Sequence, residues 1–194
     1  MPAPEFQPNT LAEWRDWLEA NHSQSSGIWL ITFKKSSGKQ QLTQDMAIEE
    51  ALCFGWIDSK PGKIDSERTK LWFSPRKPQT GWSQLNKKRI TKLLNDGRMH
   101  AAGLQKVDDA KRDGSWTLLD DVEALIIPDD LVQAFAAYPG SREHFDHFPR
   151  SVKRGILEWI VQAKRPETRQ RRIEETARLA ADNIRANQWS RKKK

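Results

Sequence analysis

Apolar positions recur along this chain with two different spacings, one typical of strands and one typical of helices. Residues 28–35 (IWLITFKK) are β-branched and aromatic, and the turn-like SSGK after them predicts a strand end. Residues 56–59 and 71–74 also favour extended structure. The Pro and Gly of KPGKIDSERTK, between these two segments, predict a hairpin turn. About three short antiparallel strands are therefore expected in the N-terminal half.

The helical spacing extends over most of the remaining chain. Thr10 and Glu13 have the spacing of a capping box, which predicts a helix over residues 11–20. Thr43 is expected to cap a helix that ends at Phe54, with Gly55 as its stop. Further helices are predicted at 82–96, 99–113, 129–137, 141–148, 152–164 and from 166 onward.

The same patterns predict the buried side or the cap of three of these helices. The helix after Trp82 is expected to place Leu85, Ile90, Leu93 and Leu94 on one apolar side. Ser151 is expected to cap the helix over 152–164. The last helix should pack through Ile173, Ala177, Ala180 and Ile184.

These elements predict an α+β fold that is mostly helical. A small antiparallel sheet lies in the N-terminal part, residues 1–114, and a helical C-terminal subdomain covers residues 115–194. We expect both parts to pack as one compact unit, because 194 residues with 37% hydrophobic content suffice for a core. Nine Trp and seven Phe exclude a wholly disordered chain.

The single cysteine and the first residues bear on cellular location. Cys53 cannot form a disulfide within the chain, so a reducing compartment is expected. The first ten residues lack a basic cap and an apolar run, and no segment reaches 18 uncharged apolar residues. These features predict a soluble cytoplasmic protein without membrane insertion. Cys53 itself is expected to be buried and unreactive, because Leu52 and Phe54 flank it.

Charge is distributed in blocks. The chain carries 33 Lys and Arg against 26 Asp and Glu, a formal charge of +7. Residues 1–59 carry −4 and residues 60–98 carry +8, while residues 108–130 carry −6. Such blocks can mark an anion-binding face, and they can equally pair with each other or be solvated.

The segment from Gly55 to Gly97 combines aromatic, cationic and amide side chains. Arg and Lys beside aromatic rings are suited to anion recognition, because a guanidinium both stacks and donates paired hydrogen bonds. Two prolines stiffen the Pro-Arg-Lys-Pro loop at 75–78, which lowers the entropy cost of binding. Alternatively, the Trp residues belong to the core. The ligand-binding candidates are Trp56, Asp58, Arg68, Arg76, Lys77, Trp82, Asn86 and Arg89.

Two of these candidates have open roles. Asn86 is either a structural tie or a ligand contact, because a buried amide must satisfy its hydrogen bonds. Asp58 either braces Arg68 or Arg76 in an ion pair or acts as a general base, and bracing is favoured. Arg76 is expected to be exposed, and Trp56, Asp58, Arg76, Trp82 and Asn86 are expected to form one cluster.

A second basic patch is predicted in AKRPETRQRRI at 163–173. Arg165, Arg169 and Arg172 fall on one side of a helix, whereas Glu167 and Glu174 can pair with arginines four residues on. His144 and His147 in EHFDH lack a third ligand at fixed spacing, so no metal site is predicted. No nucleotide, zinc or hydrolase motif occurs, and no cofactor is expected.

Five blocks resemble one bacterial family. They are EALCFGWIDS at 50–59, FSPRKP at 73–78, WSQLNKKRI at 82–90, LLNDGRM at 93–99 and AKRPETRQRRI at 163–173. In this order they resemble the YdeI/OmpD-associated (bacteriocin-protection) family. The resemblance implies a small cytosolic protein with a stress or bacteriocin-tolerance role and transfers no catalytic residue. The positions that match its hallmark blocks include Gly55, Trp56, Asp58, Pro75, Arg76, Trp82 and Asn86.

Three functions follow as hypotheses. The leading one is a noncatalytic or weakly catalytic protein that binds a small anionic ligand through the Trp and Arg segment. The second is weak, sequence-independent nucleic-acid binding by two basic blocks, residues 60–98 and 150–194. The third is an enzyme on a small anionic substrate, with Asp58 as base and Arg76 as anion clamp.

Overall fold

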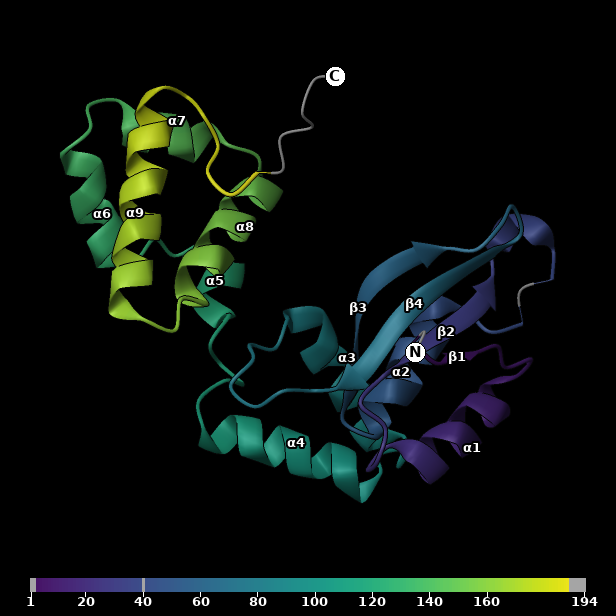
Figure 1. Ribbon diagram of the computed structural model, residues 1–194. Coiled ribbons are helices and arrows are strands. Elements are labelled where there is room, and N and C mark those ends of the chain that lie inside the picture. Colours follow the sequence, from purple (N-terminus) through teal and green to yellow (C-terminus); the bar gives the residue numbers. More distant parts are fainter. Residues whose placement is uncertain (1–2, 40, 189–194) are drawn as a thin grey trace. The chain divides into compact units, whose positions relative to one another are not determined.

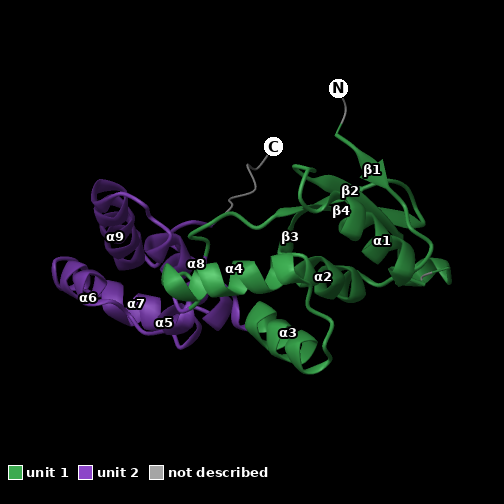
Figure 2. Ribbon diagram, turned by 90° about the horizontal axis from the view of Figure 1, so that it is seen from below, with its two compact units in different colours: residues 1–80, 85–116 green, residues 81–84, 117–194 purple. Residues whose placement is uncertain are grey.

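The computed structural model describes residues 3–39 and 41–188, which form two compact units (Figure 2). The first unit comprises Met1–Thr80 and Leu85–Trp116, and the second comprises Gly81–Gln84 and Thr117–Lys194. The first contains a sheet and helices, and the described part of the second is helical. The expected α+β class is confirmed, whereas the boundary after residue 114 stays a prediction.

Four strands form the sheet of the first unit, in the order β1-β2-β4-β3 (Figure 1). They are β1 (Glu5–Phe6), β2 (Ile28–Phe33), β3 (Trp56–Lys63) and β4 (Arg68–Pro75). β1 runs parallel to β2, and the other neighbours are antiparallel. The three expected antiparallel strands are confirmed. β1 is an addition that the sequence did not indicate, because two residues are too few to show a period.

The hairpin turn differs from the expectation. Pro61 and Gly62 lie inside β3, where the pairing with β4 shifts register between Asp58 and Pro61. β3 is an edge strand, and a bulge there tolerates a residue without an N–H group. The chain reverses at Asp65 instead, because its Oδ1 accepts hydrogen bonds from the N–H groups of Glu67 (2.9 Å) and Arg68 (2.7 Å).

The first two helices of the first unit begin at their expected caps, whereas the next two begin two residues after their expected starts at 82 and 99. They are α1 (Leu11–Asn21), α2 (Gln44–Cys53), α3 (Gln84–Asn95) and α4 (Ala101–Arg112), with a short 3₁₀ turn at Lys35–Ser37. Thr10 accepts a hydrogen bond from the N–H of Glu13 (3.2 Å), and Thr43 accepts one from Met46 (3.2 Å). Gly55 follows α2 in the left-handed conformation (φ 74°), which favours glycine.

Both α1 and α2 lie on the same side of the sheet (Figures 1 and 2). Trp14 of α1 is fully buried, and its ring lies 5.4 Å from the ring of Phe73 on β4. The Trp14 indole N–H donates to the Ala47 carbonyl of α2 (3.1 Å). This one side chain therefore joins the sheet to both helices.

The apolar side expected for α3 is partly wrong. Ile90 and Leu93 are buried together with Asn86, whereas Leu85 and Leu94 are 58% and 45% exposed. Spacings of three and four residues from Asn86 select the buried stripe, and the two exposed leucines lie beside it. Asn86 therefore occupies a core position on this helix.

The second unit is a group of helices with its own core. They are α5 (Asp120–Glu123), α6 (Asp129–Ala136), α7 (Ser141–His147), α8 (Arg150–Val161) and α9 (Pro166–Ala181). Its fully buried side chains include Leu131, Phe145, Ile156, Ile173 and Ala177.

Two details of the second unit correct the sequence expectations. α8 begins at Arg150 with Pro149 at the cap position, so Ser151 is not its cap. Proline suits a helix start because it has no N–H group to leave unpaired. Ile184 lies after the end of α9 and is 50% exposed, so Thr176 joins Ile173, Ala177 and Ala180 as the fourth buried position.

A glycine marks the close contact between α4 and the end of α2. A Cβ atom at Gly103 would lie 2.1 Å from the Cys53 carbonyl oxygen, so the backbone would have to move. We expect Gly103→Ala to lower the free energy of unfolding by about 2–3 kcal/mol. Gly155→Ala in α8 is the matched control, because its Cβ would meet nothing within 4 Å. It should raise the same quantity by about 1 kcal/mol. Urea unfolding of both variants measures these changes, and equal effects would contradict the contact.

Candidate functional site

The Pro-Arg-Lys-Pro loop after β4 is held at both ends by backbone contacts. The Arg76 N–H donates to the Gly55 carbonyl (2.9 Å), which adds one bond beyond the β3–β4 ladder. The Thr80 hydroxyl donates to the Lys77 carbonyl (2.8 Å). The loop therefore has a defined shape, as expected from its two prolines.

The Arg76 side chain is buried, which corrects the expectation of an exposed cation. Only 6% of the residue is exposed, and its Nη2 donates to the Thr80 carbonyl (3.1 Å). Burial lowers the pKa of Arg76 to about 10, because desolvation disfavours the charged form. Through this hydrogen bond Arg76 braces the loop, while Lys77 beside it is exposed.

Asn86 and Arg89 join α3 to α2. The Arg89 guanidinium donates to Asn86 Oδ1 (3.0 Å) and to Asp45 Oδ1 (2.5 Å). Asn86 is 8% exposed and Arg89 has 13% of its side chain exposed. These contacts fit the structural tie, one of the two roles left open for Asn86.

Trp56 lies in the core of the first unit. It is 1% exposed, its indole N–H donates to the His22 carbonyl (3.2 Å), and its ring meets Trp17 edge-on at 5.7 Å. Asp58, two residues further along β3, pairs in register with Phe73. Trp82 is buried but belongs to the second unit.

Arg68 lies at the other end of β4 from Arg76, roughly 25 Å away along the strand. Its Nε donates to Asp65 Oδ2 (2.8 Å), and this hydrogen bond lowers the pKa of Asp65. The partner of Arg68 is therefore Asp65 and not Asp58. Arg68 does not lie beside the Arg76 loop.

A group that the sequence did not single out links α3 to the segment that follows α4. Trp116 follows α4, and two ammonium groups lie over its ring: Lys87 Nζ at 5.4 Å and Lys111 Nζ at 5.7 Å. We call Lys87, Lys111 and Trp116 the lysine–tryptophan cluster. Twenty-nine positions separate its outer members along the sequence, so no local spacing could have revealed it.

The Arg76 loop is tied to the end of α4 beside this cluster. The N–H of Gln79, a residue in the left-handed conformation (φ 57°), donates to Asp113 Oδ2 (3.3 Å). The Ser115 N–H donates to Asp113 Oδ1 (2.9 Å), and the hydrogen bonds from Ser115 lower the pKa of this carboxyl. Asp113 therefore stays ionised near neutral pH and links the loop to α4.

The second basic patch is largely engaged within its own unit. Arg169 donates to both Asp130 oxygens (2.7 and 3.0 Å). Arg172 donates to the Trp159 carbonyl and lies 4.9 Å over the Trp159 ring. Both arginines therefore have partners within the second unit. Arg165 is the exposed residue that precedes α9.

The two histidines of the EHFDH segment contact the backbone of their own unit. His144 and His147 each turn Nδ1 toward a backbone carbonyl, that of Ala180 (2.9 Å) and that of Glu143 (2.7 Å). Among the described residues, no three His, Cys, Asp or Glu side chains could hold a metal ion together. No helix in the same residues is long and apolar enough to cross a membrane.

Two family models match separate parts of the chain, and the gap between the matches includes the boundary between the two compact units at Trp116. Residues 6–106 match the family described as Domain of unknown function (DUF8412). Residues 124–183 match the family described as Bacteriocin-protection, YdeI or OmpD-Associated. No curated protein and no solved structure matches the chain.

The second match confirms the resemblance stated from the sequence, over that part of the chain. Of the five blocks quoted for it, AKRPETRQRRI at 163–173 lies in the matched residues. The other four lie before residue 100, within the match to the family of unknown function.

Because Arg76 is buried and Lys77 is exposed, we expect substitution of Arg76 to lower stability much more than substitution of Lys77. Arg76→Ala should lower the free energy of unfolding by about 2–4 kcal/mol, because it leaves a cavity and removes a donor from the Thr80 carbonyl. Arg76→Met keeps most of the volume and should cost less. Lys77→Ala, the exposed control, should change stability by less than about 0.5 kcal/mol. Thermal unfolding measures all three, and an Arg76→Ala variant as stable as the parent would exclude the brace.

The buried thiol of Cys53 should react slowly. The residue is fully buried, and desolvation raises its pKa to about 11. At pH 8 only about one thiol in a thousand is then ionised, and only the thiolate attacks alkylating reagents. We expect iodoacetamide to label the native protein at least about a hundredfold more slowly than the urea-unfolded chain. Equal labelling rates would show that the thiol is accessible.

Proposed function

We propose that this chain, which belongs to the family described as Domain of unknown function (DUF8412), is a protein without catalytic activity that binds an anionic ligand. The proposed site is the lysine–tryptophan cluster of the first unit, with Lys77 of the neighbouring loop. The observation that supports it is the convergence of two ammonium groups, Lys87 and Lys111, on the single ring of Trp116.

Two like charges near one ring favour an anion for an electrostatic reason. Each ammonium gains from the negative face of the indole ring, yet the two repel each other. A phosphate or carboxylate that contacts both replaces this repulsion with two attractions. Lys111 lies in the last turn of α4, where the helix dipole favours a cation, and its side chain stays accessible because the residue is exposed.

The loop adds a third cation at low entropic cost. Lys77 is exposed, and its backbone is fixed by the Thr80 hydroxyl. The bond from Gln79 to Asp113 ties this loop to the end of α4, two residues beyond Lys111. A preorganised loop loses little freedom when a ligand binds. Asp113 is one acidic group beside the site, and two backbone N–H groups already engage it.

The alternative functions have less support from contacts. A nucleic-acid surface based on Arg165, Arg169 and Arg172 would have to compete with the Asp130 pair and the Trp159 contact. An enzyme with Asp58 as base needs an anion clamp at Arg76, whose guanidinium donates to the Thr80 carbonyl. We therefore rank both below anion binding.

The biological setting of the proposal comes from the second family match alone. Its description reads Bacteriocin-protection, YdeI or OmpD-Associated. We propose bacteriocin tolerance as the process in which the anion-binding protein acts, in the cytoplasm.

Titration with inorganic pyrophosphate tests the proposed site. The parent protein should bind it at low ionic strength, with an affinity that falls as salt is raised from about 20 to 150 mM, because exposed charges are screened. Lys111→Gln and Lys77→Gln should each weaken binding about threefold to fivefold, and the double variant about tenfold or more. Isothermal titration calorimetry gives these affinities.

The matched control is Lys63→Gln, an exposed lysine at the end of β3. It should leave pyrophosphate binding unchanged. Equal losses in Lys63→Gln and Lys111→Gln would show a diffuse charge effect instead of a site. An absence of binding to the parent protein would overturn the proposal.

A further inference from the structure

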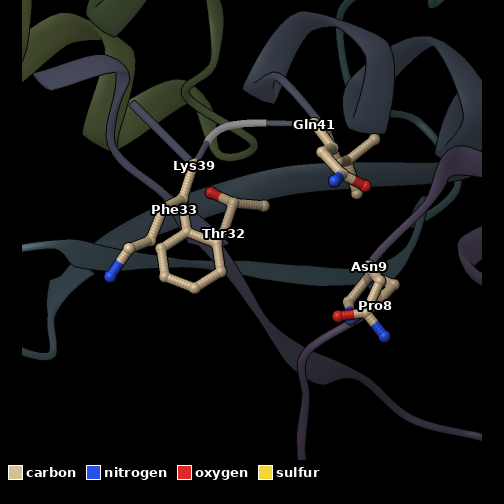
Figure 3. A pocket seen from close by; sticks show the side chains of 7 residues that line it. Pro8, Asn9, Thr32, Phe33, Lys39 and Gln41 are labelled. Atoms are coloured by element: carbon tan, nitrogen blue, oxygen red, sulfur yellow. The ribbon is translucent and has the colours of Figure 1, made fainter. Parts of the chain in front are cut away.

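A cavity of about 420 Å³ opens beside the end of β2 in the first unit (Figure 3). This volume lies within the range of about 300–1,000 Å³ that is typical of small-molecule sites. Its walls combine apolar and neutral polar side chains. The apolar ones are Pro8, Phe33 and Leu42, and the polar ones are Asn9, Thr32 and Gln41.

Thr32 presents an unused polar group to this cavity. The residue is 6% exposed, and no described residue forms a hydrogen bond with its hydroxyl. No fully buried side-chain oxygen or nitrogen of the described residues lacks a partner, so the Thr32 hydroxyl must be reached through the cavity. Water in the cavity can bond to this hydroxyl, and a ligand group that replaces the water would take over the bond.

The charge at the rim is already balanced. Lys39 Nζ contacts both carboxylate oxygens of Glu67, at 2.9 and 3.0 Å. Figure 3 shows its amino end directed away from Asn9 and Gln41. An anion in the cavity would therefore gain little from Lys39 and would lie near the Glu67 pair. The cavity favours an uncharged ligand, in contrast to the lysine–tryptophan cluster.

The remaining side chains suit the edge and the face of a flat heterocycle. Asn9 and Gln41 lie on one side of Thr32 in Figure 3, with Phe33 on the other. An amide carries a donor and an acceptor side by side, which matches the edge of a nucleobase. The side chain of Gln41 is exposed and forms no hydrogen bond with a described residue, and Asn9 uses only Nδ2, toward Glu13 (3.4 Å). Lys39 Nζ lies 5.9 Å from the centroid of the Phe33 ring, so a base that stacks on Phe33 would take the ring face opposite Lys39.

We infer that this cavity binds an uncharged nucleobase-type heterocycle or its nucleoside. Phe33 stacks on the ring, Thr32 bonds to a ring nitrogen or carbonyl, and the amides of Asn9 and Gln41 read the edge. The inference does not depend on the anion site, because the two sites share no residue and require opposite ligand charge.

Titration of the full chain with adenosine tests the inference. Binding is measured by calorimetry and by shifts of the side-chain amide signals of Asn9 and Gln41 in NMR spectra. We expect a Kd between about 10 µM and 1 mM, the range for a ligand of this size. Thr32→Val removes only the hydroxyl at nearly constant volume and should weaken binding about fivefold without lowering thermal stability. Phe33→Ala should weaken binding about tenfold or more.

Two control variants and two control ligands make the result specific. Gln105→Ala, a surface glutamine on α4, and Lys111→Gln should both bind adenosine as the parent does. Adenosine monophosphate should bind no more tightly than adenosine at this cavity. Ribose should bind at least about tenfold more weakly, because it has no ring to stack.

Several outcomes would overturn the inference. They are no adenosine binding at about 10 mM, binding unchanged in Thr32→Val and Phe33→Ala, or ribose binding as tightly as adenosine. A tighter affinity for the monophosphate that is lost in Lys111→Gln would assign the nucleotide to the anion site instead. Loss of adenosine binding with intact pyrophosphate binding would remove this inference and leave the proposed function standing.

Discussion

The first unit depends on one buried carboxylate. Glu50 lies near the end of α2 with 2% of its side chain exposed, and it contacts two guanidinium groups. Arg15 comes from α1, and Arg98 follows α3, where its Nη2 lies 2.5 Å from Glu50 Oε2. Removal of one partner from a buried ion pair is costly, by about 3–5 kcal/mol, because the other charge stays desolvated. Three segments of the chain must therefore meet at this point.

The position of α4 follows from the same junction. Arg98 is held by Glu50, and His100 then begins α4 and stacks on Phe54 at 4.9 Å. The His100 N–H donates to the Cys53 carbonyl (3.1 Å). With Gly103 against the same carbonyl, α4 has little freedom to shift. This rigid start fixes where α4 ends, and hence where Lys111 and Trp116 lie.

Many charged side chains of the described residues form internal ties, which explains why composition alone was a poor guide to a site. Arg15, Arg89, Arg98, Arg154 and Arg169 each pair with a carboxylate of the same unit. The net charge of +7 therefore says little about which cations meet a ligand. The proposed anion site rests on lysines near an aromatic ring, and the inferred nucleoside site rests on neutral groups beside a balanced pair.

Local chemistry was sufficient for the elements themselves. The caps at Thr10 and Thr43, the stop at Gly55 and the β-branched run of β2 act over a few residues, so the sequence determined them. The burial of Cys53 followed in the same way from the apolar side of its helix. The α+β class could be predicted because it is a property of these elements and their order.

The tertiary structure decided what depends on partners far along the chain. Pro61 could enter a strand only because β3 became an edge. The burial of Arg76 depends on its loop, whose backbone bonds to Gly55 just before the start of β3. The pairing of Lys87 with Lys111 over Trp116, and the cavity between the segments near Pro8, Thr32 and Gln41, arise from residues distant in sequence. Sequence spacing carries no information on such contacts, since packing and burial select them only after the elements come together.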